Sequence, residues 1–376
     1  MSAETTLRSL QAFVYRYPIA RPVTTSFGVM QDRPAVFIRA EDSEGCVGWG
    51  ETWCNFPSMG AEHRARIVEQ VLALIVVDRP CGDPVEVFEL LTERTAVLAL
   101  QCGETGPFAQ AIAGVDVALW DIASQRSGRP LWKLLGGGGP TIGVYASGIN
   151  PDGAEAIARR MRDQGHRAFK LKIGFAPDVD IANLRLLRET LGPATSLAVD
   201  ANQAWTLTEA IVRASAIRRF NLEWLEEPLR ADRPLGEWKQ LAKVAGMPLA
   251  AGENLTGNES FKRAIQSKAL SVVQPDIAKW GGISGALQVG RAARDAGLRF
   301  CPHYLGGGIG LLASAHLLAA IGGDGLLEID SNENPLRDEL CGDVRWVKDG
   351  RVTLGSAPGI GSTPELASFE RFRVQH

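Results

Sequence analysis

Acidic residues that could bind a metal follow several short apolar runs in this chain of 376 residues. Asp200 ends SLAVD, Glu226 and Glu227 end LEWLEE, and Glu253 ends PLAAGE. These acids have no cysteine or histidine beside them, and a set of oxygen ligands suits a hard cation such as Mg²⁺. Because side chains alternate along a strand, we expect only one of Glu226 and Glu227 to point inward. One such acid alone would be an ordinary loop residue, but their joint occurrence indicates a metal site.

Basic residues that could move protons occur in similar runs. Lys170 and Lys172 alternate in FKLKIG, so they share one face of a strand. That face could simply be solvated, or the two ammonium groups could point inward, lower each other's pKa and leave one lysine as a neutral base. His303 in CPHYL and Asp276 in QPDIA could pair, with the carboxylate fixing the imidazole tautomer to give a general base.

Eight β-like runs must position these residues, and they recur between residues 141 and 330. Their spacing of roughly 25 residues is the length of one strand, one helix and two loops. Segments 154–165, 179–192, 206–220 and 283–297 between them have the apolar spacing of helices. We therefore predict an α/β fold with a β/α barrel, and the alternative is a doubly wound open sheet. In a barrel the carboxyl ends of all strands meet at one mouth.

The chain outside these runs has a different pattern. Residues 1–137 are predicted to form a separate α+β domain with a hairpin turn at Asp42–Gly45, and residues 138–340 form the barrel. Residues 341–376, with a second hairpin turn at Asp349–Gly350, are predicted to form an antiparallel segment that returns to the first domain.

Composition excludes several classes of protein. The net charge of −3 gives no basic excess for nucleic acid. No apolar stretch reaches the roughly eighteen residues that cross a membrane, and the N-terminal segment lacks the apolar core of a signal peptide, so we expect a cytoplasmic protein. The six cysteines lack CxxC spacing, which indicates reduced, structural thiols. The glycine-rich stretches LLGGGGP and LGGGIG lack phosphate-binding spacing and are predicted to form tight turns.

Several motifs in the same order resemble those of the enolase superfamily, mandelate racemase subgroup. The motifs are KxK in FKLKIG, VDANQ, WLEEP, GEN, PDIAKWGGI, PHY and LLEID, and the resemblance covers essentially the whole chain. It implies a modified (β/α)7β barrel with an N-terminal capping domain, and a symmetric homo-oligomer. That superfamily uses a Lys or His base with Mg²⁺ ions that stabilise an enediolate.

The resemblance also implies roles for individual residues. Asp200, Glu226 and Glu253 resemble the three Mg²⁺ ligands, and Lys172 resembles one acid/base. Asp276 and His303 resemble the dyad on the opposite face of the substrate. Glu328 resembles the group that hydrogen-bonds the substrate carboxylate, and Lys170 and Asn202 resemble further contacts to it.

Two expectations about protonation follow from these roles. Glu328 must be neutral to donate a hydrogen bond, so burial beside other acids should raise its pKa. The charge of Lys170 should help to keep Lys172 neutral enough to accept a proton.

The chemistry implied is removal of the proton alpha to a carboxylate. Dehydration of an acid sugar is the favoured outcome, and racemisation or epimerisation of a 2-hydroxy or amino acid is the alternative. A Schiff-base lyase that uses Lys172, or an inactive binding barrel, would be a protein of another class.

Substrate choice in the resembling family lies in loops of the capping domain. Thr25, Trp53 and Asn55 are our candidates for contacts with the substrate, in segments 21–28 and 53–59. Arg337 after the last strand could hold a distal carboxylate, or it could form a surface salt bridge.

Overall fold

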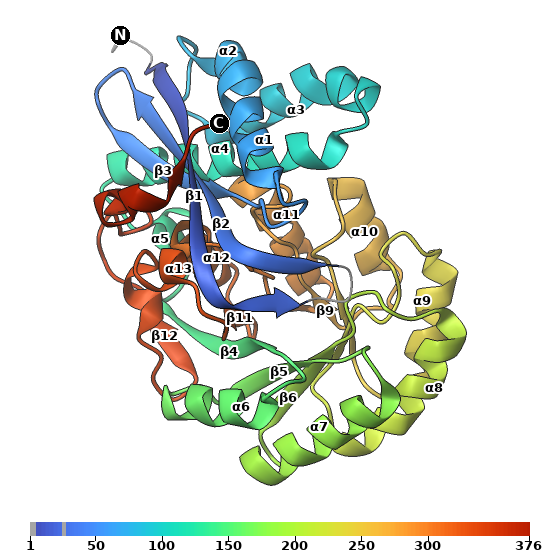
Figure 1. Cartoon of the computed structure of the whole chain (residues 1–376). Helices are drawn as coiled ribbons and strands as arrows, with labels where there is room; N and C mark the ends of the chain where they lie inside the picture. The colour runs from blue at the N-terminus through green and yellow to red at the C-terminus, as the bar shows by residue number, and fades with distance from the viewer. Residues whose placement is uncertain (1–4, 25–27) are drawn as a thin grey trace.

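The computed structural model describes residues 5–24 and 28–376, and its N-terminal part is an antiparallel sheet backed by helices (Figure 1). The strands are β1 (Leu7–Thr24), β2 (Val29–Asp42) and β3 (Val47–Thr52). The helices are α1 (Gly60–Ile67), the π-helix η1 (Val68–Leu72), α2 (Ala73–Val76), α3 (Pro84–Gln101), α4 (Thr105–Arg126) and α5 (Leu131–Leu134). The sheet has the order β13-β1-β2-β3, in which β13 (Arg373–Val374) comes from the end of the chain.

The turn between β2 and β3 is the hairpin predicted from the sequence. The Oδ1 atom of Asp42 accepts hydrogen bonds from the backbone N–H groups of Glu44 (3.0 Å) and Cys46 (2.9 Å). Gly45 has a φ of +84°, a conformation that glycine adopts without a steric penalty. The sequence and the backbone geometry therefore agree at this turn.

Glycines allow α4 to lie directly against β3. A Cβ atom on Gly50 would lie 2.0 Å from the carbonyl oxygen of Gly114, and one on Gly48 would lie 2.1 Å from that of Ala118. These neighbours are helix backbone, which cannot move aside as a flexible side chain can. The capping sheet and its main helix are thus held at a distance that only glycine permits.

We predict that Gly50→Ala lowers the free energy of unfolding by about 3 kcal/mol, because the added methyl group overpacks this contact. Urea unfolding followed by tryptophan fluorescence measures the change. Gly106→Ala, in the helix α4 that Gly50 contacts, is the matched control, since a Cβ on Gly106 would meet no atom within 4 Å. This substitution should leave stability unchanged or raise it slightly. Equal unfolding midpoints for Gly50→Ala and the wild type would contradict the prediction.

The eight strands predicted from the sequence form a nearly closed parallel barrel. They are β4 (Thr141–Ile149), β5 (Ala168–Lys172), β6 (Ser196–Asp200), β7 (Leu225–Glu226), β8 (Leu249–Ala251), β9 (Val272–Val273), β10 (Arg299–Phe300) and β11 (Leu326–Asp330). Their order in space is β10-β9-β8-β7-β6-β5-β4-β11. A doubly wound sheet would reverse its strand order at one point, and this order does not, so the alternative fold is wrong.

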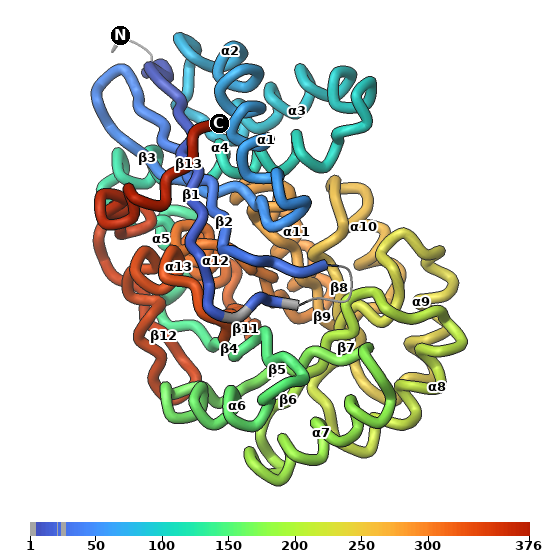
Figure 2. The backbone as a smooth tube through the Cα atoms, viewed as in Figure 1, coloured from blue at the N-terminus to red at the C-terminus, as the bar shows by residue number. Residues whose placement is uncertain are grey.

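Helices surround the barrel (Figures 1 and 2). They are α6 (Ala154–Asp163), α7 (Pro177–Leu191), α8 (Leu207–Ile217) with the 3₁₀ turn η2 (Arg218–Phe220), α9 (Leu235–Val244), α10 (Asn258–Gln266), α11 (Gly282–Asp295) and α12 (Gly308–Ile321). The four helical segments predicted from the sequence correspond to α6, α7, α8 and α11. Local sequence explains the start of α8, where Thr206 and Glu209 form a reciprocal capping box.

Only short helices follow β11 in residues 331–376, so the barrel has seven β/α units and a final strand. The segments are α13 (Pro335–Asp338), η3 (Gly342–Arg345), β12 (Arg351–Thr353) and η4 (Leu366–Phe372). Asp349 and Gly350 both have positive φ, as a two-residue hairpin turn requires, and β12 pairs antiparallel with β4. β13 then pairs antiparallel with β1.

The boundaries at residues 137 and 340 stay a prediction. Among the helices of the described chain, none is long and apolar enough to cross a membrane.

Candidate active site

A cavity lies at the carboxyl ends of the barrel strands, under the capping domain. Most of the candidate residues line it: Lys172, Asn202, Glu253, His303 and Glu328 from the barrel, with Trp53 and Asn55 from the capping domain. Lys170, Asp200, Glu226 and Asp276 are buried and do not line it. Thr25 lies outside the described residues.

The barrel interior contains an apolar layer of Tyr145, Ala168, Ala198, Trp224, Ala250, Val272 and Cys301. This layer belongs to the same strands that carry the polar residues. The polar groups of the site are therefore supported by a packed interior rather than by an open pore.

Both lysines of FKLKIG point into the barrel, so the interpretation as a solvated strand face is wrong. Lys170 is 0% exposed, and its Nζ atom lies 2.5 Å from Oε1 of Glu226 and 2.8 Å from Oε1 of Glu328. The Nζ atom of Lys172 lies 2.5 Å from Oδ2 of Asp200 and 2.8 Å from Oδ1 of Asn202. Lys172 is therefore paired with a carboxylate on the adjacent strand β6, and Lys170 with carboxylates two strands away on either side, on β7 and β11.

These pairings change the expected protonation of Lys172. Burial lowers its pKa and so does the charge of Lys170, but the charges of Asp200, Glu253 and Glu226 together outweigh them, and the pKa lies above its ordinary value. Lys170 thus lowers the pKa of Lys172 as expected, but the expectation that this leaves Lys172 neutral is wrong for this arrangement of side chains. Burial also lowers the pKa of Lys170, but Glu226 and Glu328 raise it well above its ordinary value, so Lys170 stays charged as expected.

Glu226 and Glu227 are both buried, and neither of them lines the cavity. Glu226 contacts Lys170 inside the barrel. Glu227 has a φ of +38°, so strand alternation ends at Glu226. The side chain of Asn254 donates hydrogen bonds to Glu227 (2.9 Å) and to Glu253 (2.9 Å). Burial, followed by the charges of Glu253 and Asp200, raises the pKa of Glu227 well above its ordinary value.

The expected metal ligands are turned towards cations of the protein itself. Glu226 contacts Lys170, Asp200 contacts Lys172, and Glu253 contacts His303. As the side chains stand in residues 5–24 and 28–376, no three His, Cys, Asp or Glu residues form a ready group for a metal ion.

The charges of the site nevertheless fit a divalent cation. Six buried carboxylates gather there: Asp200, Glu226, Glu227, Glu253, Asp276 and Glu328. The cations among them are Lys170, Lys172, Lys279 and, when protonated, His303. With all six ionised, the carboxylates would exceed these cations by two charges, and the raised pKa values of the buried Glu226 and Glu227 are consistent with a site that lacks a counter-charge. The donor set of oxygens therefore suits Mg²⁺.

Asp276 and His303 form the predicted pair. The two residues are joined by a parallel β-bridge, and Nδ1 of His303 lies 2.7 Å from Oδ2 of Asp276. The other oxygen of Asp276 accepts hydrogen bonds from the backbone N–H groups of Ala278 and Lys279. Burial lowers the pKa of His303, but the charges of Glu253 and Glu328 raise it well above its ordinary value.

Glu328 has a lowered pKa, so the expectation of a neutral acid is wrong here. Burial raises its pKa, but the charges of Lys170 and His303 outweigh burial and lower it to about 2. Ser147 donates a hydrogen bond to Oε1, and the backbone N–H of Tyr304 donates one to Oε2 (3.2 Å). Its nearest charges are cations rather than the other acids.

Capping-domain residues are fixed to the barrel loops. The backbone N–H of Trp53 donates to the carbonyl of Ala278 (3.1 Å), and the side chain of Asn55 donates to the carbonyl of Leu305 (2.6 Å). The buried carboxylate of Glu51 accepts hydrogen bonds from the backbone N–H groups of Gly307 and Gly310. The stretch LGGGIG therefore binds a carboxylate of the protein itself at these N–H groups.

Two functional candidates were not predicted from the sequence. Lys279 lines the cavity, with Nζ 3.3 Å from Oε1 of Glu253 and 4.9 Å from the centre of the Trp53 ring. Ser147 also lines the cavity and holds Glu328. A signal existed for Lys279, since it lies three residues after Asp276 in the PDIAKWGGI motif. Ser147 lies in an apolar strand and gives no such signal.

Arg337 does not reach this cavity, so it is not placed to hold a distal carboxylate there. It is only 5% exposed and forms ion pairs with Asp330 (3.3 Å) and Asp338 (2.7 Å). Asp330 also pairs with Arg33 of β2 (2.9 Å), and both of those side chains are buried. The pairing with Asp330 links the capping sheet to the end of β11.

Comparison with known proteins identifies the family. Residues 9–136 match the N-terminal domain of the mandelate racemase / muconate lactonizing enzyme family. Residues 153–368, more than half of the chain, match the enolase C-terminal domain-like family.

The chain belongs to the enolase superfamily. Within it, the mandelate racemase subgroup expected from the motifs is confirmed.

Individual relatives agree with this assignment. A mandelate racemase/muconate lactonizing enzyme from Bordetella bronchiseptica RB50 is 54% identical, with a TM-score of 0.93 over 98% of this chain and 99% of that one. A racemase from Streptomyces coelicolor A3(2) with bound magnesium is 27% identical, with a TM-score of 0.87 over 98% and 100% of the chains. An arabinonate dehydratase from Saccharolobus solfataricus is 29% identical over 90% of this chain and 91% of its own. This enolase superfamily member is thus an enzyme, a lyase or an isomerase.

Proposed function

We propose that the enzyme removes the proton alpha to the carboxylate of a small hydroxycarboxylate, with Mg²⁺, and that an acid sugar is dehydrated. The observation that carries the proposal is that Lys172 and His303 reach one cavity from β5 and β10. Those strands are almost opposite each other in the barrel order. A substrate carbon between them would have a proton-transferring group on each face.

We assign the first step to Lys172. In its neutral form its Nζ atom takes the alpha proton, and the C–H electron pair moves into the carboxylate to form an enediolate. Lys170 stays charged with its Nζ atom 2.8 Å from Oε1 of Glu328 in the cavity wall, and the side-chain amide of Asn202 lines the same cavity, so these two groups can stabilise the negative charge. Preorganised groups of this kind stabilise the transition state more than the substrate.

We assign the second step to His303. Its protonated Nε2 atom gives a proton to the beta hydroxyl, the C–O bond breaks as the enediolate electron pair forms a C=C bond between the alpha and beta carbons, and water leaves. The resulting enol then tautomerises to a 2-keto acid. Asp276 keeps the imidazole oriented through the contact to Nδ1.

Mg²⁺ would be held by Asp200, Glu226 and Glu253, and when bound it would supply positive charge that stabilises the developing negative charge of the substrate carboxylate. The bound magnesium of the Streptomyces coelicolor racemase supports this choice of ion. A cytoplasmic location and a symmetric homo-oligomer stay predictions.

Racemisation or epimerisation is the second candidate. The same two groups permit it, because one can take the proton and the other can return a proton to the opposite face. The relatives support both outcomes, since one is named a dehydratase and another a racemase. A Schiff-base lyase is disfavoured by the contacts of Lys172 with Asp200 and Asn202, and failure of borohydride to trap substrate would exclude it.

Metal removal tests the proposal. The protein is incubated with a library of acid sugars and 2-hydroxy acids, with Mg²⁺ or with EDTA, and keto acids and epimers are measured. We expect at least one acid to be converted with Mg²⁺, a loss of about 10³-fold in EDTA, and recovery when Mg²⁺ is restored. The result against the proposal would be no conversion of any acid, or conversion that EDTA leaves unchanged.

A further inference from the structure

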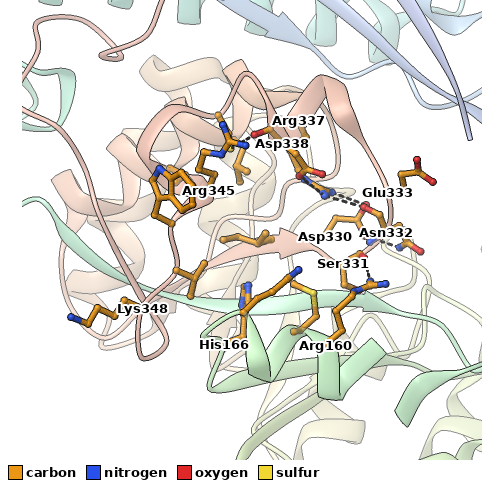
Figure 3. Close-up of a pocket in the computed structure, with 18 residues that line it drawn as sticks. Arg160, His166, Asp330, Ser331, Asn332, Glu333, Arg337, Asp338, Arg345 and Lys348 are labelled. Atoms are coloured by element: carbon orange, nitrogen blue, oxygen red, sulfur yellow. Dashed lines mark hydrogen bonds and ion pairs between the residues drawn. The ribbon is translucent and has the colours of Figure 1, made fainter. Parts of the chain in front are cut away.

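A second cavity of about 640 Å³ lies outside the barrel, against β11 (Figure 3). In a complete β/α barrel a long helix follows each strand and covers its outer face. After β11 only α13 and the segment 341–348 do so, and the cavity lies between them and α6. Asp330 and Asn332 line both this cavity and the active-site cavity, and the two cavities have no other lining residue in common.

The inner surface of this cavity is apolar. Ile329 follows Glu328 on β11, so alternation directs it to the outer face of the strand. Further apolar lining residues are Met161, Leu311, Cys341, Val344 and Val347. Trp346 also lines the cavity and is 70% exposed, which is unusual for so large an apolar side chain. A ligand with an apolar body would cover this surface.

Three basic side chains of the cavity have no acidic partner. Arg160, Arg345 and Lys348 line it, and within residues 5–24 and 28–376 none of the three forms an ion pair. Arg160 donates one hydrogen bond, to the carbonyl of Ser331 (2.6 Å). Arg345 lies over the ring of Trp346, 5.0 Å from its centre.

The acids of the cavity do not offset these charges. Asp330 pairs with Arg33 and Arg337, and Asp338 also pairs with Arg337. Glu333 lies at the edge of the cavity far from Lys348 (Figure 3). The cavity therefore has an excess of positive charge.

A buried histidine adds a second, independent polar feature. His166 is 2% exposed, and its Nδ1 atom has no hydrogen-bond partner in the described chain. Its ring projects from the base of the cavity, between Arg160 and Lys348 (Figure 3). Burial, followed by the charges of Arg337 and Arg167, lowers the pKa of His166 to about 4. The imidazole of His166 is therefore held in its neutral form, and Arg337 and Arg167 contribute a positive potential at its position.

We propose that this cavity is a second ligand site, which binds a small organic anion such as a phosphate ester. The negative group lies among Arg160, Arg345 and Lys348, and the apolar body lies on the inner surface beside Trp346. Phosphate is the chosen anion because guanidinium groups bind it through several hydrogen bonds.

Calorimetric titration of the full-length protein with phenyl phosphate tests this site. EDTA is present so that the ligand cannot bind through a metal ion. We expect the wild type to bind phenyl phosphate more tightly than inorganic phosphate or phenol, which carry only the charge or only the ring. No binding by the wild type at about 10 mM, or equal binding of inorganic phosphate, would overturn the proposal.

Charge reversal locates the binding. The Arg345→Glu, Lys348→Glu double variant should bind phenyl phosphate at least about tenfold more weakly. The matched control is Lys239→Glu, Lys243→Glu on α9, two exposed lysines beside β7, across the barrel from β11. It changes the net charge equally and should keep wild-type affinity. Equal weakening in both variants, with unchanged thermal midpoints, would show non-specific attraction and overturn the proposal.

Discussion

Lys172→Ala should lower kcat by about 10³-fold, because it removes the group that takes the alpha proton. The Nζ atom is placed for this by Asp200 and Asn202, and it reaches the cavity while Lys170 does not. KM should change much less than kcat, since the carboxylate contacts of the substrate are assigned to other residues. Steady-state kinetics with the acid identified by the library screen measures both constants.

Two further variants make this result specific. Lys262→Ala removes an exposed lysine of α10 and should leave kcat unchanged. His303→Asn should also abolish net turnover, but through the opposite face of the substrate. If the reaction is an epimerisation, each of the Lys172 and His303 variants should still exchange the alpha proton of one epimer with D₂O. Full turnover by Lys172→Ala in both directions would refute the assignment of this base.

Asp276→Asn should lower kcat by about 10³- to 10⁴-fold with little change of fold, by analogy with the triad aspartate that fixes a histidine tautomer. One oxygen of Asp276 accepts hydrogen bonds from the backbone N–H groups of Ala278 and Lys279. In the asparagine variant the amide oxygen, which can accept these hydrogen bonds, would take that position. The amide NH₂ group would then face Nδ1 of His303, which now lies 2.7 Å from a carboxylate oxygen. The imidazole would then carry its proton on Nε2 and could not also be protonated on Nδ1, so the imidazolium that gives a proton to the hydroxyl would not form.

The pH dependence of kcat distinguishes this tautomer effect from a loss of stability. Asp276→Asn should remove the limb that reports protonation of His303, and its thermal midpoint should stay near that of the wild type. Asp163→Asn, at an exposed position of α6, is the control and should keep the wild-type profile. An Asp276→Asn enzyme with wild-type kcat would mean that this carboxylate does not orient the histidine.

Much of the fold was predictable because local sequence and barrel geometry agree. Seven of the eight β-like runs carry a chemically active polar residue near their carboxyl ends, and parallel strands bring such ends to one mouth. The regular spacing of the runs gave all eight strands, and the motif FKLKIG gave two lysines on one face. Pairing of Asp276 with His303 was also predictable, because their strands β9 and β10 are neighbours.

Protonation was not predictable, because it depends on distances that the sequence does not contain. Glu328 lies against Lys170 and His303 rather than against other acids, so its pKa falls instead of rising. Lys172 lies 2.5 Å from Asp200, and this contact outweighs the effect of Lys170.

Backbone conformation and long-range pairing account for the other differences. Glu227 leaves the alternation of β7 because its φ is positive, which no strand pattern reveals. Arg337 is buried because Asp330 and Asp338 pair with it. Lys279 reaches the active-site cavity from the loop after β9, which sequence reasoning treated as a connection.

The fate of the alpha hydrogen tests the central claim most directly. A substrate from the library screen, carrying deuterium at the alpha carbon, is converted by the Mg²⁺-loaded wild type in ordinary water, and the product is examined by mass spectrometry. The account predicts that the deuterium is lost to solvent and that the chemical step shows a primary kinetic isotope effect. Product that keeps the deuterium at any carbon, formed without an isotope effect, would contradict it.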